Sequence, residues 1–191
     1  MRTTGAALLG AGAITVVGGL TMQLVDSSVS DNVYSSPYSS SAFVVVCVTA
    51  ALSHALAFAG LLRLRHPSLV GPSQAAQRGL QLALAATALM VVGELTGIPI
   101  RDKLESDTLP TIVGAGFGLA TLVFAVGTIL AGRAAARDGV WRDGRRLLLL
   151  IWGFAALPLL VLAPTDLFGY GLVIWGVPML LLGRALSSFG N

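Results

Sequence analysis

Six apolar segments separated by short polar connections dominate the sequence. They cover roughly residues 5–25, 42–62, 79–97, 111–131, 147–163 and 167–186. An α-helix rises about 1.5 Å per residue, so about 20 apolar residues cross a hydrocarbon core about 30 Å thick. The segment at 147–163 is the shortest and just reaches the lower limit of about 17 residues. The pattern predicts an all-α, polytopic membrane protein: a single domain over residues 1–191 that forms a bundle of six transmembrane helices.

The basic residues favour one orientation of these helices in the membrane. They gather in alternate connections and at the ends: Arg63, Arg65 and Arg78 between the second and third segments, Arg133, Arg137, Arg142, Arg145 and Arg146 between the fourth and fifth, and Arg2 and Arg184 beside the two termini. Arg and Lys concentrate on the cytoplasmic side of membrane proteins. We therefore expect both termini in the cytoplasm, in a multi-pass protein of the bacterial cell membrane (the inner membrane). We also expect the first segment to be retained, because no A-x-A cleavage site follows it.

Composition agrees with a membrane location and excludes several kinds of chemistry. Hydrophobic residues make up 55% of the 191 and charged residues 11%, whereas soluble proteins carry about 25% charged residues. The net charge of +3 resides beside apolar segments, where it sets topology, so no nucleic-acid partner is expected. The single cysteine, Cys47, cannot form a disulfide within the chain or a multi-thiolate metal site. With only two histidines, His54 and His66, we expect no metal and no cofactor.

Glu94 is the main candidate for chemistry, because it interrupts the apolar run LMVVGELTGIPI at residues 89–100. With the third segment centred near Ala88, Glu94 lies about 9 Å from the midplane, in the half of the membrane that faces away from the cytoplasm. An ionisable group there costs about 2–3 kcal/mol and normally faces a partner or a wet cavity. Burial favours the proton-bearing form, which can act as a general acid. The alternative is a structural carboxylate that bonds a neighbouring helix.

Two further carboxylates are candidates to complete an acidic cavity near the outer leaflet. Asp166, in the short turn LAPTDLFGY, is expected at the N-cap of the last helix, where the helix dipole favours a negative charge. If Asp166 and Glu94 share a cavity, different surroundings divide the acid and base roles between them, which makes both candidate catalytic residues. Asp26 follows the first helix and is a candidate to bind substrate in the same cavity. Simple capping by Asp166 and a water-facing position for Asp26 are the alternatives.

His54, in VTAALSHALAFAGLL, lies in the second segment about 3 Å on the cytoplasmic side of the midplane. This position predicts that His54 and Glu94 differ by about 12 Å in depth, too far for a hydrogen bond. His54 is a candidate to bind substrate or to pass protons toward Glu94, with the hydroxyls of Thr49, Ser53 and Thr87 along the path. A neutral imidazole bonded to a neighbouring polar group is the alternative.

Three further features concern packing and surfaces. Gly114 and Gly118, in VGAGFGLA, have the GxxxG spacing that lets two helices approach closely, and we expect them to join copies of the chain in a homo-oligomer. Pro158 and Pro178 are expected to bend the last two helices. The Ser-rich connection at 27–41 is expected to be flexible, and a lid over the cavity is the alternative.

The chain as a whole resembles small six-helix membrane proteins of high-GC bacteria whose function is unassigned. The resemblance is carried by SHALAFAGLLRL, by VGELTGIPI and by GVWRDGRRLLLLIWG, in which Trp141 suits the aromatic belt at the inner boundary. Arg outnumbers Lys eleven to one, which agrees with a high-GC genome. This resemblance implies the six-helix fold and a bacterial source, and it implies no activity.

The acids within the membrane segments also resemble those of the membrane-embedded terpene cyclases, which are small all-helical proteins. The resemblance implies that Glu94 and Asp166 protonate an epoxide or alkene of an isoprenoid substrate. Such cyclases need aromatic side chains around the substrate, because ring faces stabilise cations. The candidates for this role are Phe117 and Trp175, with Phe124, Trp152, Phe168 and Tyr170 in support.

The sequence leaves three functions open. The first is binding, and acid-catalysed conversion by Glu94, of a lipid-like isoprenoid in a cavity near the outer leaflet. The second is a small proton-linked transporter in which Glu94 and His54 handle protons, and it requires a polar route to both faces. The third is a non-catalytic accessory subunit in which Glu94 ties helices together. The lipid bilayer and a hydrophobic small molecule are the expected partners.

Overall fold

Every regular element of the described chain is a helix. The computed structural model describes residues 2–139 and 147–188. Its helices, in chain order, are α1 (Arg2–Leu24), α2 (Ser40–Leu64), α3 (Pro67–Val70), α4 (Gln74–Ile100), α5 (Thr108–Arg137), α6 (Leu148–Leu162) and α7 (Phe168–Ser187). Within these ranges no strand forms, and one isolated bridge pairs Val33 with Leu104. The all-helical prediction is therefore confirmed.

Five of the helices, α1, α2, α4, α5 and α7, are long and apolar enough to cross a membrane. The apolar helix α6 has 15 residues, and at about 1.5 Å per residue it is shorter than a hydrocarbon core about 30 Å thick. The connection that precedes α6, at 140–146, contains Trp141 and three of the predicted inner arginines and lies outside the described residues. The described part of the chain is thus helical and contains five candidate membrane-spanning helices.

Three helices, α2, α4 and α5, extend at both ends beyond the apolar segments that predicted them. α4 covers Gln74–Ile100 where the sequence predicted 79–97, and α5 covers Thr108–Arg137 where it predicted 111–131. Apolar residues mark only the part of a helix that suits hydrocarbon, whereas the helix itself runs on to its capping residue. At the start of α4 that residue is Ser73, whose hydroxyl oxygen accepts a hydrogen bond from the N–H of Ala76 at 3.3 Å. Pro158 and Pro178 lie inside α6 and α7, as predicted.

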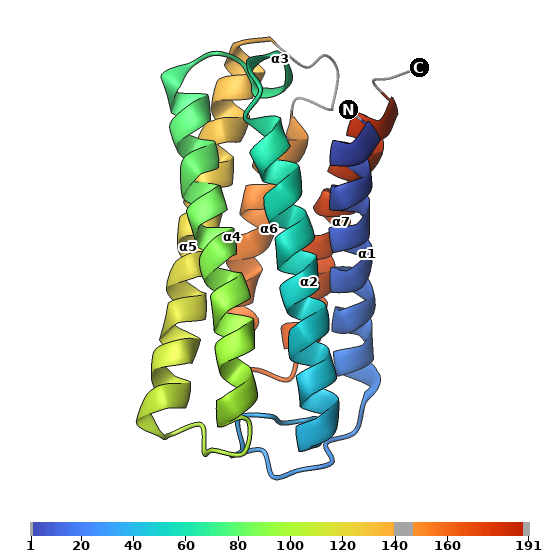
Figure 1. The fold of residues 1–191 in the computed structure, drawn as a ribbon, viewed down its shortest axis with the longest axis vertical. Coiled ribbons are helices and arrows are strands. Elements are labelled where there is room, and N and C mark those ends of the chain that lie inside the picture. The colour runs from blue at the N-terminus through green and yellow to red at the C-terminus, as the bar shows by residue number, and fades with distance from the viewer. Residues whose placement is uncertain (1, 140–146, 189–191) are drawn as a thin grey trace.

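The six long helices pack as a closed ring. Around it, α1 contacts α2, α2 contacts α4, α4 contacts α5, α5 contacts α6, α6 contacts α7, and α7 contacts α1. Figure 1 shows these helices lying side by side along one common direction, with the short α3 at one end. Phe124, Trp152 and Met179 are fully buried, whereas large apolar side chains such as Val17 and Ile112 are exposed. An apolar exterior fits a lipid surrounding, because lipid tails are as apolar as the side chains that meet them.

Three pairs of glycines join α1 to α7. The pairs are Gly5 with Gly183, Gly12 with Gly176, and Gly19 with Gly169. A Cβ added at Gly12 would lie 3.0 Å from the carbonyl O of Gly176, and one added at Gly19 would lie 2.5 Å from that of Gly169. Hydrogen at these positions therefore lets the two backbones approach closely, as small residues do in membrane helix pairs. The first helix is therefore packed closely against the last one.

Gly114 and Gly118 have no such role within the chain. Both lie on the surface of α5, and a Cβ added at either would meet nothing within 4 Å. Gly114 and Gly118 therefore form a patch without side chains on the outer surface of α5, which we call the smooth strip.

Two connections meet at the end of the ring opposite the start of α1 and the end of α7 (Figure 1). Residues 25–39 join α1 to α2 and residues 101–107 join α4 to α5, and we call this end the loop end and the opposite end the terminal end. The N–H of Tyr34 donates to the carbonyl O of Lys103 at 2.9 Å, and the N–H of Glu105 donates to the carbonyl O of Asn32 at 2.9 Å. The Ser-rich connection, expected to be flexible, is thus hydrogen-bonded to its neighbour.

Candidate functional site

Glu94 and His54 face each other between α4 and α2. The Oε1 atom of Glu94 lies 3.8 Å from the Nδ1 atom of His54, and the two side chains are 18% and 11% exposed. The predicted difference of about 12 Å in depth is therefore wrong. We refer to this pair as the Glu94–His54 site.

The packing register of the two helices explains the correction. The prediction set the centres of the two apolar segments level, but the structure places Gly97 of α4 beside Cys47 of α2, with 3.6 Å from a Cβ added at Gly97 to the cysteine Sγ. Counted from this level, Glu94 lies about 4.5 Å and His54 about 10.5 Å toward the terminal end, which leaves about 6 Å between their backbones.

The direction of the side chains closes the remaining gap. A helical Cα–Cβ bond tilts toward the N-terminus of its helix. α2 begins at the loop end and α4 begins at the terminal end (Figure 1). The side chain of His54 therefore leans toward the loop end and that of Glu94 toward the terminal end, so each leans toward the other.

A cluster of aromatic rings continues from His54 into the middle of the ring of helices. The ring centroids of His54 and Trp175 are 5.7 Å apart, those of Trp175 and Phe124 are 5.5 Å apart, and those of Phe124 and Trp152 are 4.9 Å apart. The last two pairs meet edge to face, the geometry that aromatic rings prefer. Neither indole N–H has a hydrogen-bond partner among the described residues. The site is therefore bounded by apolar rings on the side that faces the middle of the ring of helices.

Tyr34 and Cys47 lie against α4 at Gly97, about one turn from Glu94 toward the loop end. A Cβ added at Gly97 would lie 3.4 Å from Cε1 of Tyr34 and 3.6 Å from Sγ of Cys47, so the two side chains converge on one point of α4. Burial and the nearby Glu94 carboxylate, in that order, raise the pKa of Tyr34 to about 12. Neither neighbour was predicted from the sequence, because the hydropathy pattern reveals neither the register of α2 and α4 nor the path of the connection at 25–39.

Two of the three hydroxyls expected to form a proton path, those of Ser53 and Thr87, are hydrogen-bonded to backbone carbonyls. Ser53 donates to the carbonyl O of Ala11 at 2.9 Å, and Thr87 donates to the carbonyl O of Ala83 at 2.7 Å. Thr49 is exposed on the outside of the ring. Within the described residues none of these hydroxyls is hydrogen-bonded to the Glu94–His54 site.

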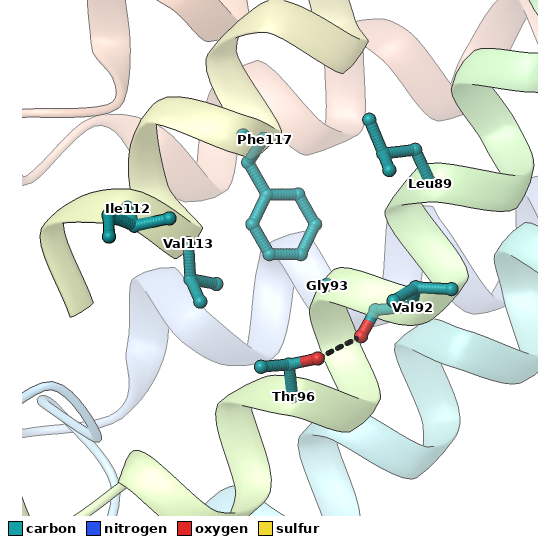
Figure 2. A pocket seen from close by; sticks show the side chains of 8 residues that line it. Leu89, Val92, Gly93, Thr96, Ile112, Val113 and Phe117 are labelled. Atoms are coloured by element: carbon teal, nitrogen blue, oxygen red, sulfur yellow. Dashed lines mark hydrogen bonds between the residues drawn. The ribbon is translucent and has the colours of Figure 1, made fainter. Parts of the chain in front are cut away.

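Phe117, predicted to bind substrate, lies in a different place from the other aromatic candidates. It lines an open groove of about 230 Å³ between α4 and α5, with Leu89, Val92, Gly93, Thr96, Ile112, Val113 and Gly116. Figure 2 shows its ring lying over Gly93, and a Cβ added there would be 2.8 Å from the ring. The hydroxyl of Thr96 donates to the carbonyl O of Val92 at 2.7 Å (Figure 2), so the groove offers apolar surface only.

The two aspartates lie in exposed turns at the loop end. Asp166 was predicted to be the N-cap of α7, and this prediction is wrong. The N-cap is Leu167, whose N–H donates to the hydroxyl oxygen of Thr165 at 3.2 Å. The carbonyl O of Asp166 accepts a hydrogen bond from Nε2 of Gln23 at 3.0 Å, and its side chain is exposed. Asp26 is exposed just beyond α1. Within the described residues no ion pair or hydrogen bond joins either aspartate to the Glu94–His54 site.

The site can hold and move a proton. Its two ionisable groups are 3.8 Å apart, longer than a hydrogen bond, so the carboxyl keeps the capacity to bond a third group. Within residues 2–139 and 147–188, no group of three His, Cys, Asp or Glu side chains is placed to hold a metal ion.

Comparison of the chain with protein-family models, with curated proteins and with solved structures finds no match, and neither resemblance drawn from the sequence is supported by these comparisons. The class of protein is therefore defined here by its fold and its candidate site alone. Over the residues that the structure describes, the protein is all-helical, with five candidate membrane-spanning helices and a largely buried pair of ionisable side chains between two of them.

Proposed function

We propose that this protein is a six-span protein of the bacterial cell membrane, with both termini in the cytoplasm, that binds a hydrophobic small molecule at the Glu94–His54 site and transfers a proton to it from Glu94. In this arrangement α6 makes the sixth crossing. The site then lies in the half of the membrane that faces away from the cytoplasm.

The observation that carries the proposal is the largely buried contact of 3.8 Å between Glu94 and His54. Ionisable side chains at membrane depth are rare and usually functional. A carboxyl group with an imidazole beside it is equipped as a general acid, because the imidazole can take up or return the proton that the carboxyl exchanges with a substrate. His54 is therefore the proton partner of Glu94 rather than a remote member of a relay.

The aromatic rings beside the site favour a substrate that becomes cationic. The ring of Trp175 adjoins that of His54, and ring faces attract cations. An isoprenoid whose alkene or epoxide accepts the proton from Glu94 would develop such a cation, in the manner of the membrane-embedded terpene cyclases. In this proposal Trp175 binds the reacting end of the substrate. Asp166 and Asp26 take no part, because they lie in exposed turns.

Proton-linked transport is the alternative that shares the same residues. It needs a polar route from the site to both ends of the ring. The neighbours of His54 toward the middle of the ring are instead the packed apolar rings of Trp175, Phe124 and Trp152. We therefore expect that vesicles containing the purified wild-type protein and vesicles containing Glu94→Gln show the same proton flux under a pH gradient. A flux that disappears in Glu94→Gln would replace catalysis by transport.

The main test compares cells that produce the wild-type protein with cells that produce Glu94→Gln or Glu105→Gln. Glu105 is exposed at the loop end and serves as the matched control. Neutral lipids are extracted at equal protein levels and compared by mass spectrometry. We expect one product to disappear in Glu94→Gln while its precursor accumulates, and the control to match the wild type. Identical profiles in all three strains would contradict the proposal.

The orientation is tested separately with reporters fused after residue 191. A fluorescent protein that matures only in the cytoplasm is expected to be bright there, and a phosphatase that is active only outside the cytoplasm is expected to be silent. The opposite pattern would place the C-terminus outside and would require an odd number of crossings or an inverted bundle.

A further inference from the structure

The connection at 25–39 is clamped across the loop end of the site. Besides the bonds of Tyr34 and Glu105 already described, the N–H of Ser35 donates to the carbonyl O of Arg101 at 3.1 Å, and Val33 forms an antiparallel bridge with Leu104. The hydroxyl of Ser40 also donates to the carboxylate of Asp102. The backbone bonds hold residues 32–35 against residues 101–105, which follow the end of α4, and the bond of Ser40 ties the start of α2 to the same connection.

The clamp points one side chain into the space between the two helices. The ring of Tyr34 meets the ring of Phe43 edge to face at 5.7 Å. Its hydroxyl oxygen is 3.7 Å from a Cβ added at Gly97, so the ring lies against the bare backbone of α4. A Cβ added at Gly97 would touch the ring at an ordinary contact distance, so no space is left between Tyr34 and this turn of α4.

Tyr34 is also the polar neighbour of Glu94 on this side. The Glu94 carboxylate is among the groups that raise the pKa of Tyr34 to about 12, after burial itself. The phenol is therefore neutral at physiological pH, and it presents an apolar ring with one hydroxyl group above the acid. On the other side of the site the aromatic cluster is fully packed.

We propose that Tyr34 is the lid of the Glu94–His54 site: its ring closes the gap between α2 and α4 at Gly97, and a small molecule reaches Glu94 from the loop end by displacing the ring. The assignment rests on the proposed function only in taking Glu94 as the group to be reached. Tyr34 acts as a positioning and access residue.

The single cysteine of the chain is a built-in probe of this lid. Cys47 is 3% exposed and converges with Tyr34 on Gly97, and no other thiol can react. The purified protein in detergent is treated at one fixed pH with a small methanethiosulfonate that carries a quaternary ammonium group. The rate at which Cys47 is modified is followed by the increase in intact mass.

We expect slow modification in the wild type and a rate at least about tenfold higher in Tyr34→Ala, because closed and open states exchange and only the open state reacts. Tyr34→Phe keeps the ring and is expected to react like the wild type. Tyr170→Ala removes an exposed tyrosine of α7 and is the matched control. An intermediate rate is expected for Tyr34→Leu, which keeps apolar bulk if the alanine variant fails to fold.

Equal rates in the wild type, in Tyr34→Ala and in Tyr34→Leu would overturn the lid, and so would a wild-type rate equal to that of the unfolded chain. The circular dichroism melting temperature of each variant shows that it is folded. The readout needs no turnover, so it separates the two proposals. Faster modification of Cys47 in Tyr34→Ala, together with an unchanged lipid profile in Glu94→Gln, would support the lid and contradict acid catalysis. An unchanged modification rate in Tyr34→Ala, together with a lost product in Glu94→Gln, would contradict the lid and support acid catalysis.

Discussion

His54 of α2 and Glu94 of α4 meet at 3.8 Å although their positions in the apolar segments predicted a wide separation. Both are largely buried in helices that are apolar enough to cross a membrane. The pair therefore has either a structural or a chemical role, and the stability of variants distinguishes the two.

Glu94→Leu is expected to leave the stability of the protein unchanged or to raise it by about 1–2 kcal/mol, because leucine removes the cost of burying an ionisable group. Function is expected to be lost in the same variant. Melting temperatures in detergent, with Glu105→Leu as the exposed control, measure the effect. A loss of more than about 2 kcal/mol would instead identify Glu94 as a tie that holds α4 to α2.

Tyr34 provides a prediction for high pH. Its pKa is raised from 10.0 to about 12 in the folded protein, so the neutral phenol is favoured by folding. The stabilisation is complete below pH 10 and is lost as the pH rises through about 12, where the folded protein must ionise the phenol. The tyrosinate absorbance of the wild type minus that of Tyr34→Phe isolates this group, and a midpoint near the ordinary value of 10.0 would show that the ring is not buried.

The glycine pairs between α1 and α7 predict an unequal response to the same substitution within one helix. A Cβ added at Gly12 lies 2.8 Å from the backbone N of Leu180, whereas one added at Gly18 meets nothing within 4 Å. Gly12→Leu is therefore expected to destabilise the protein by about 2–3 kcal/mol through overpacking, and Gly18→Leu to be nearly neutral. Thermal unfolding of the two variants checks this, and equal melting temperatures would show that α1 and α7 are not held by these pairs.

The homo-oligomer expected through Gly114 and Gly118 predicts a different result. Because neither glycine packs within the chain, Gly114→Leu and Gly118→Leu are expected to leave the melting temperature of the monomer unchanged. If the smooth strip joins two copies, both substitutions weaken their association in chemical cross-linking and in light scattering of the detergent-solubilised protein. A population that stays associated in both variants would exclude this strip as the contact.

The candidate site was predictable only in part. The sequence identified Glu94, His54 and Trp175, because ionisable and large aromatic side chains stand out in apolar runs. It misplaced Asp166, because an aspartate before a helix is a good cap by type, whereas here Thr165 supplies the oxygen that Leu167 needs. It grouped Phe117 with the site, although Phe117 lies in the open groove on the α5 side of α4. It gave no role to Tyr34 beside Glu94.

By itself the sequence determined that the chain is helical and that most of its helices suit a membrane, because the length and apolar character of a segment are local properties. Only the tertiary structure decided which side chains meet. The hydropathy of a segment does not reveal how far one apolar helix is shifted along another, because lipid and a neighbouring helix offer equally apolar surroundings. In the register that α2 and α4 adopt, Gly97 lies beside Cys47, and this register brings His54 to Glu94.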